Sequence, residues 1–167
     1  MTETITTRNG IDLIGLERMA DDVARDPSRG IAKFRVNTNW MGGTRSETRV
    51  EDWELGGRRL PRGFSIATDE PPELLGRAAA PNPQEVLMAG LNACMMVGYV
   101  AGCAAHGIEL RSISIETEGE LDLRGFLGLD ASVKPGYEEI RYTVRLRGDG
   151  APEAFQRVHE TVMAQSP

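Results

Sequence analysis

The residues of this chain best suited to covalent chemistry are its two cysteines, Cys94 and Cys103. Both lie in residues 86–105, a stretch of twenty residues without a charged side chain. A cysteine thiolate is a nucleophile and can be oxidised to a sulfenic acid. On a helix, the nine steps between the two cysteines turn through about 900° and rise by about 13 Å, whereas a disulfide needs Cα atoms within about 7 Å. We therefore expect no disulfide between these thiols within one intact helix.

Spacing alone leaves the role of Cys94 open. At about 100° per residue, Cys94 shares a helical stripe with Leu87, Gly90, Leu91 and Gly98, and the two glycines leave room for another group to approach. One interpretation is a shielded reactive sulfur, which requires a positive or hydrogen-bonding environment. The other is a cysteine that only fills space in a core, as free cysteines often do.

The charge-free stretch itself has two interpretations, a membrane span and a helix of a soluble core. Its length is close to what crosses a bilayer. Against a span, Asn92 is polar, no Lys or Arg cluster flanks either end, and Asn82, Pro83 and Glu85 form a capping box typical of soluble helices, with Gly107 as terminator. We therefore predict a soluble helix buried on nearly all sides, at the centre of a domain or of a dimer.

Composition narrows the class of protein. The chain has 167 residues, which is enough for one domain with a hydrophobic core. Its net charge of -6 and pI of about 5.0 argue against a nucleic-acid partner, because proteins that bind nucleic acids are usually basic. Two cysteines without a Cys-x-x-Cys or histidine cluster indicate no disulfide framework, metal site or cofactor. The first residues lack the apolar run of a signal peptide, so we expect a cytoplasmic protein without a membrane partner.

Periodicity predicts the elements around the long helix. Apolar residues at helical spacing predict a first and a last helix, and alternating residues predict strands. The last helix carries His159 on a polar face, which we interpret as a solvated side chain. The order of strands and helices indicates an α+β fold. The predicted elements are helices over 10–24 and 151–165, strands over 31–40, 46–55, 64–69, 113–121 and 140–146, and a glycine-rich connection over 122–136.

Several sequence blocks resemble those of a known family. The blocks are residues 39–48, 69–76, 80–94, 119–128 and 166–167. Their order and spacing resemble the OsmC/Ohr family from about Phe34 to the end of the chain. The Pro-Asn-Pro to Ala-Cys block and the Leu-Asp-Leu-Arg-Gly block together are specific, whereas either alone is weak.

The resemblance implies an α+β fold of the OsmC type. In such proteins two β-sheet layers surround long central helices, and two chains interlock in a homodimer with the thiol sites at their interface. We expect an N-terminal helical extension over residues 1–30, which resembles one in some OsmC-like branches, and an OsmC-like domain over residues 31–167.

The resemblance also implies a thiol chemistry. In peroxidase members, a helix cysteine attacks an organic or hydrogen peroxide and becomes a sulfenic acid. A second cysteine then forms a disulfide that small thiols or lipoylated proteins reduce, and an arginine and a glutamate activate the thiolate. The motif match places Cys94 at the peroxidatic position and Arg45, after a Gly-Gly turn, at the activating arginine.

The chain departs from that pattern at two positions. Gln84 stands at the family glutamate, and Glu85, one residue later and about 100° further round the helix, can replace it only if the helix start is shifted. Ser166 occupies the position of the family's resolving cysteine, and a serine forms no disulfide. The predicted catalytic residues are therefore Cys94, Arg45 and Glu85.

Two functions follow. The first is a thiol-dependent reductase of organic or hydrogen peroxide with a single reactive cysteine, which needs a thiol reductant. The second is a non-catalytic OsmC-fold protein that binds a small apolar or thiol-containing ligand in the dimer cleft. The retained Cys94 and Arg45 favour the first, and the replacements at Gln84 and Ser166 favour the second.

Overall fold

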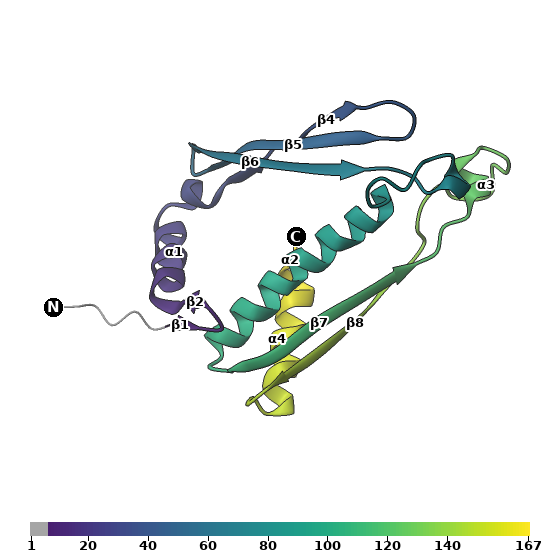
Figure 1. Cartoon of the computed structure of the whole chain (residues 1–167). Coiled ribbons are helices and arrows are strands. Elements are labelled where there is room, and N and C mark those ends of the chain that lie inside the picture. The colour runs from purple at the N-terminus through teal and green to yellow at the C-terminus, as the bar shows by residue number, and fades with distance from the viewer. Residues whose placement is uncertain (1–6) are drawn as a thin grey trace. The chain divides into compact units, whose positions relative to one another are not determined.

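The computed structural model describes residues 7–167 and consists of two compact units (Figure 1). Of the described residues, the first unit comprises residues 7 and 12–87, and the second comprises residues 8–11 and 88–167. The helix α2, Pro83–Ala105, begins in the first unit and continues in the second. Strands precede each long helix, so the α+β class is confirmed.

The first unit contains a four-stranded antiparallel sheet. The central strand β5, Ser46–Leu55, pairs along one edge with β3, Ala32–Phe34, and β4, Asn37–Trp40, and along the other edge with β6, Arg58–Thr68. The sequence predicted both ends of β5 correctly. It placed the start of β6 six residues too late, because Arg58 to Gly63 lack an apolar alternation although they pair with β5.

The predicted strand over residues 31–40 is two strands. β3 and β4 lie on the same edge of β5, and the chain leaves the ladder at Arg35 and Val36. Opposite this break the β5–β6 register shifts, since Val50 pairs with Phe64 but Asp52 pairs with Pro61. Proline cannot donate a ladder hydrogen bond and is tolerated at edge strands and bulges. The interruption is therefore a property of the paired strands and is invisible in residues 31–40 alone.

The N-terminal part of the first unit is helical. The helix α1, Leu13–Arg25, is capped by Asp12, whose carboxylate accepts from the Gly15 N–H at 3.0 Å. A short 3₁₀ turn, Pro27–Gly30, follows it. The helix predicted over residues 10–24 is confirmed, although it begins three residues later because β2, Ile11–Asp12, pairs with β1, Thr7–Arg8.

The second unit packs a β-hairpin and a helix against one side of α2. The strands β7, Leu110–Gly119, and β8, Ile140–Gly148, are antiparallel, and α4, Pro152–Gln165, follows them. The core of this unit is made of Met95, Tyr99 and Cys103 of α2, Ile108 of the following loop, and Val158 and Val162 of α4, and partly buried apolar residues of β7 and β8 pack against it. The predicted irregular connection over 122–136 contains a short helix, α3, Leu123–Phe126, which Asp122 caps.

The helix α2 is buried along one face only, contrary to our prediction of burial on nearly all sides. Its buried residues are Met95, Tyr99, Cys103 and Ala104. Val97, by contrast, keeps 68% of its surface exposed. The hydrophobic composition of the helix predicted a fully enclosed segment, but a hairpin and one helix of the same unit cover only one side of it.

Candidate functional site

The two cysteines occupy opposite environments on α2. Cys94 is exposed, whereas Cys103 has no exposed surface. Burial raises the pKa of the Cys103 thiol, which favours the unreactive protonated form. The difference agrees with the opposite helical faces inferred from their spacing, and it leaves Cys94 as the accessible thiol of the described residues.

The surface beside Cys94 is open on one side and closed on the other. A Cβ added at Gly90, one turn before Cys94, would meet no heavy atom within 4 Å. A Cβ added at Gly98, one turn after it, would lie 3.2 Å from Cγ2 of Val162. Gly90 therefore leaves open space, whereas at Gly98 the group that approaches the helix closely is α4, as the sequence predicted for a glycine at that position.

Arg45 lies at the end of the turn between β4 and β5. The Met41 N–H donates to the Arg45 carbonyl at 2.9 Å, and the Arg45 N–H donates to the Gly42 carbonyl at 3.1 Å. Gly42 and Gly43 have φ values of 97° and 60°, a left-handed conformation that favours glycine. Arg45 is exposed and its guanidinium makes no ion pair or hydrogen bond with the residues that the structure describes. Its charge is therefore available to another group.

Glu85 forms the predicted capping box. Its carboxylate accepts from the Asn82 N–H at 2.9 Å, and the Asn82 side chain accepts from the Gln84 N–H at 2.7 Å. The helix begins at Pro83, directly after this capping residue. Gln84 is exposed on the first turn. Glu85 thus has a structural task at the start of α2.

Ser166 ends α4. Its N–H donates to the Val162 carbonyl at 2.9 Å, and the residue is exposed. A serine hydroxyl cannot form a disulfide, and the other thiol, Cys103, is enclosed in the core. The described residues therefore offer Cys94 no second accessible thiol.

Asp69, which the sequence analysis overlooked, is a buried carboxylate with 1% of its surface exposed. It accepts from the Thr44 hydroxyl at 2.7 Å and from the N–H groups of Glu70, Arg77 and Ala79 at 3.0, 3.2 and 3.1 Å. The Thr44 hydrogen bond, helped by those of Ala79, Arg77 and Glu70, holds the pKa of the Asp69 carboxyl below its usual range against the opposing effect of burial. The sequence feature that could have indicated this buried carboxylate is an aspartate directly after a predicted strand and before a Glu-Pro-Pro loop.

His159 was also misinterpreted. Its Nδ1 lies 2.6 Å from the Tyr99 hydroxyl, and the two rings stack with centroids 6.1 Å apart. Tyr99 is fully buried, and burial, with a smaller contribution from Tyr142, raises the pKa of its phenol. His159 therefore anchors α4 to α2 and is not a solvated side chain.

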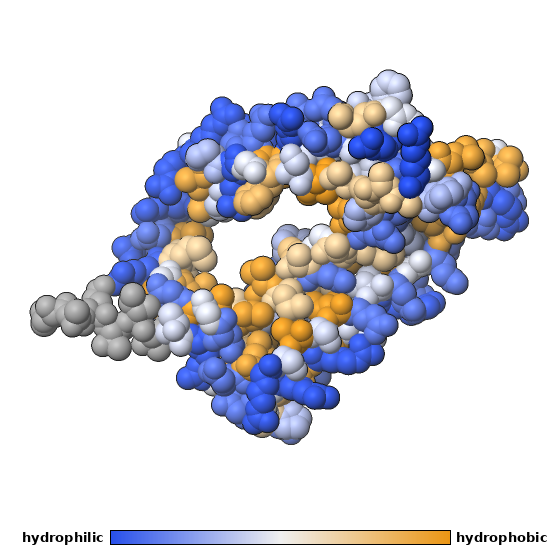
Figure 2. Space-filling view, viewed as in Figure 1, coloured by the Kyte–Doolittle hydropathy of each residue, from blue (hydrophilic) through white to orange (hydrophobic). Residues whose placement is uncertain are grey.

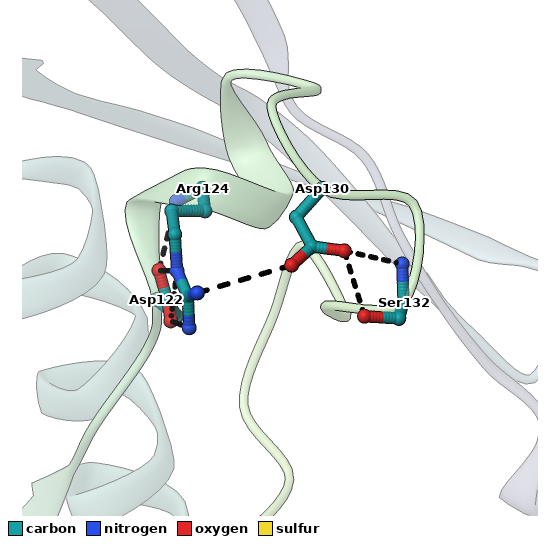
Figure 3. Close-up of polar contacts among 4 residues, drawn as sticks. All are labelled: Asp122, Arg124, Asp130 and Ser132. Atoms are coloured by element: carbon teal, nitrogen blue, oxygen red, sulfur yellow. Dashed lines mark hydrogen bonds and ion pairs between the residues drawn. The ribbon is translucent and has the colours of Figure 1, made fainter.

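The loop around α3 is braced by charged side chains (Figure 3). The Arg124 guanidinium donates to the Asp122 carboxylate, with Nε 2.9 Å from Oδ2, and lies 3.8 Å from the Asp130 carboxylate. The Ser132 hydroxyl donates to Asp130 at 2.7 Å. The loop holds exposed apolar residues, among them Phe126 at 71% exposure, and Figure 2 shows this apolar surface around α3.

Among residues 7–167, no group of three or more histidine, cysteine, aspartate or glutamate side chains is arranged to hold a metal ion.

A family model for "OsmC-like protein" matches residues 76–167, which is more than half of the chain. The chain belongs to the OsmC-like family. The matched segment contains α2 with Cys94, the braced α3 loop and α4. No curated protein matches the sequence.

Solved OsmC-like structures share the fold. An OsmC-like protein from Mycoplasma pneumoniae superimposes with a TM-score of 0.63 at 15% identity, over 81% of this chain and 83% of that chain. An OsmC-like protein of unknown function from Vibrio cholerae does so with a TM-score of 0.57 at 16% identity, over 81% of this chain and 90% of that chain. At these identities the likeness shows the α+β fold of OsmC-like proteins.

Family membership also bears on α2 as a membrane candidate. It is the one helix among the described residues that is long and apolar enough to span a bilayer. Length and composition are weak evidence, because the core helix of a soluble protein passes the same test. OsmC-like proteins are soluble, so α2 is the central helix of a soluble fold.

Proposed function

We propose that this OsmC-like protein reduces organic or hydrogen peroxides with Cys94 as its single reactive cysteine. The observation that carries the proposal is the contrast between an exposed Cys94 and a fully enclosed Cys103 on the same helix. A reactive cysteine must be accessible and near a positive group, and a structural cysteine is buried and inert.

The proposed reaction needs an external thiol. The Cys94 thiolate attacks one peroxide oxygen, an S–O bond forms, the O–O bond breaks and the alcohol or water leaves with a proton. A small thiol then condenses with the sulfenic acid, releasing water and forming a mixed disulfide. A second thiol attacks that disulfide and restores Cys94. The sum for an organic peroxide is one peroxide and two thiols giving an alcohol, water and one external disulfide, and for hydrogen peroxide a second water takes the place of the alcohol.

Arg45 is the proposed activating cation. A guanidinium beside a thiol favours the thiolate and so lowers the thiol pKa. The exposed Arg45 side chain has no partner among the described residues, which leaves its charge free for this task. Glu85, engaged in the capping box, contributes by fixing the start of the cysteine helix.

The proposed partner is a second copy of the chain. Trp40, Phe64 and Ile66 lie beside β5 on one face of the sheet and keep 77%, 58% and 40% of their surfaces exposed. Together with the uncovered face of α2, this is more apolar surface than a monomer usually displays. An interlocked homodimer in the cytoplasm would bury it. We keep residues 1–30 as a proposed extension to a domain over residues 31–167.

Peroxide consumption tests the proposal. The purified protein is mixed with cumene hydroperoxide or t-butyl hydroperoxide and a dithiol, and loss of peroxide is followed. We expect turnover by the wild type and by Cys103→Ala, and none by Cys94→Ser. Consumption at the background rate, or equal rates with and without the Cys94 thiol, would refute the peroxidase.

A second function is favoured by the space at Gly90. A Cβ there meets no atom within 4 Å, and Val97, on the next turn beyond Cys94, is 68% exposed. These groups form an apolar surface suited to a small apolar ligand. If the wild type consumes no peroxide, saturable binding of a small apolar fluorescent probe that Gly90→Leu abolishes would support a binding protein, and unsaturable binding would refute it.

A further inference from the structure

The carboxylate of Asp69 joins two segments of the first unit. One oxygen accepts from the hydroxyl of Thr44, the residue directly before Arg45, at 2.7 Å. The other accepts from the N–H groups of Arg77 and Ala79, in the loop that leads to α2. Because the carboxylate is 99% buried, water does not replace these hydrogen bonds, and their loss would leave unpaired groups.

The loop held by Asp69 has a strained backbone. Leu75 and Ala78 have φ values of 68° and 50°, which cost free energy for residues other than glycine. Gly76 packs so closely on the Glu70 carbonyl that a Cβ has no room. Such conformations persist where surrounding contacts determine them, and the Asp69 hydrogen bonds lie on both sides of Ala78.

The same loop fixes the start of α2. The Asp69 N–H donates to the Pro81 carbonyl at 3.1 Å, and the Asn82 side chain donates to the Glu70 carboxylate. Asn82 is also the capping residue, so the loop continues directly into the capping box with Glu85. The turn that carries Arg45 and the first turn of α2 are thus linked through one carboxylate.

We propose that Asp69 is a positioning residue that holds the Arg45 turn at a fixed place relative to the start of the cysteine helix. The inference rests on the proposed function, because it assigns Asp69 to the placement of the cation that activates Cys94. Thr44 is the link through which Asp69 acts on the turn.

The test uses Thr44→Val, which removes the hydroxyl and keeps the shape of the side chain. Thr38→Val is the matched control. It removes a hydroxyl that forms a 2.8 Å hydrogen bond with Thr48 in the four-stranded sheet, away from Asp69. Each change is made in the wild type and in Arg45→Ala, and the rate of Cys94 alkylation by iodoacetamide is measured against pH. This readout reports the thiolate fraction and needs no peroxide.

Thr44→Val in the wild type is expected to move the alkylation profile to higher pH and to slow alkylation at pH 7 by roughly threefold to tenfold, since small displacements at a site are costly. In Arg45→Ala it is expected to have no further effect, as for two residues that act as one unit. Thr38→Val is expected to leave both profiles unchanged.

Two results would overturn the inference. One is an equal effect of Thr44→Val with and without Arg45, which would show general loosening of the fold. The other is an unchanged profile in Arg45→Ala or in Thr44→Val. The proposed function fails separately, through a lack of peroxide turnover in a wild type whose alkylation profile depends on Arg45 and Thr44.

Discussion

At the scale of single residues, the exposed fraction of a side chain separates residues that the sequence treats alike. Cys94 and Cys103 have similar apolar neighbours in the chain, yet one thiol faces outward and the other lies in the core with a raised pKa. An accessible thiol exchanges and is oxidised, whereas an enclosed thiol is inert.

Thiol titration should separate the two cysteines. In the folded protein, a disulfide reagent such as Ellman's reagent is expected to modify one thiol per chain, and Cys94→Ser should remove that reaction. In denaturant the wild type should titrate two thiols, because burial no longer protects Cys103. Rapid reaction of two thiols in native buffer would contradict the enclosed position of Cys103.

The ionisation of Asp69 should make the free energy of unfolding depend on pH. Its pKa is lowered in the folded protein, so the ionised form contributes stability above the unfolded value of about 3.9, and this contribution is lost as the pH falls through the lower folded pKa. We expect Asp69→Asn to unfold more easily than the wild type at pH 7, with a difference that shrinks as the pH falls below about 4 and through the lowered pKa of the folded protein. Urea unfolding at several pH values measures this, and a difference independent of pH would contradict the assignment.

At the scale of elements, the sequence predicted the features that depend on residues only a few positions apart in the chain. The ends of β5 and the capping box of α2 depend on residues within a few positions, and both were predicted. The break at Arg35 and Val36 lies across β5 from the register shift at Pro61 in another strand, and the burial of α2 depends on which elements pack against it. The Cys94 position also came from a local block, whereas the hydrogen bonds of Asp69 join segments that only the fold brings together.

The glycines of α2 should respond differently to alanine. Alanine is favoured over glycine in a helix by about 1 kcal/mol, and Gly90 offers open space, so Gly90→Ala should stabilise the protein by roughly 0.5–1 kcal/mol. At Gly102 a Cβ would lie 3.0 Å from Cγ1 of Val158, and the cost of crowding, about 1–3 kcal/mol, should offset or exceed that gain. Chemical denaturation of both variants gives the comparison. Equal stabilisation by both would contradict close packing of α2 against α4.

At the scale of the whole molecule, the single chain leaves too much apolar surface uncovered. The outer face of α2 and the sheet residues Trp40, Phe64 and Ile66 expose large side chains that soluble monomers usually bury. Such side chains occur in each of the two compact units taken by itself. A second copy of the chain can cover them with the chemistry that this chain already carries.

The proposed homodimer predicts a mass of twice 18.2 kDa in solution at micromolar concentration. Phe64→Glu places a charge on the exposed sheet face, and burying an unpaired charge is costly, so it should weaken the dimer by at least tenfold in Kd. Met19→Glu is the control, because Met19 is exposed to a similar extent, 56%, on α1. Light scattering over a range of concentrations measures the equilibrium. A wild type that stays at the monomer mass would refute the homodimer, and an equal effect of both substitutions would place the interface elsewhere than on the sheet.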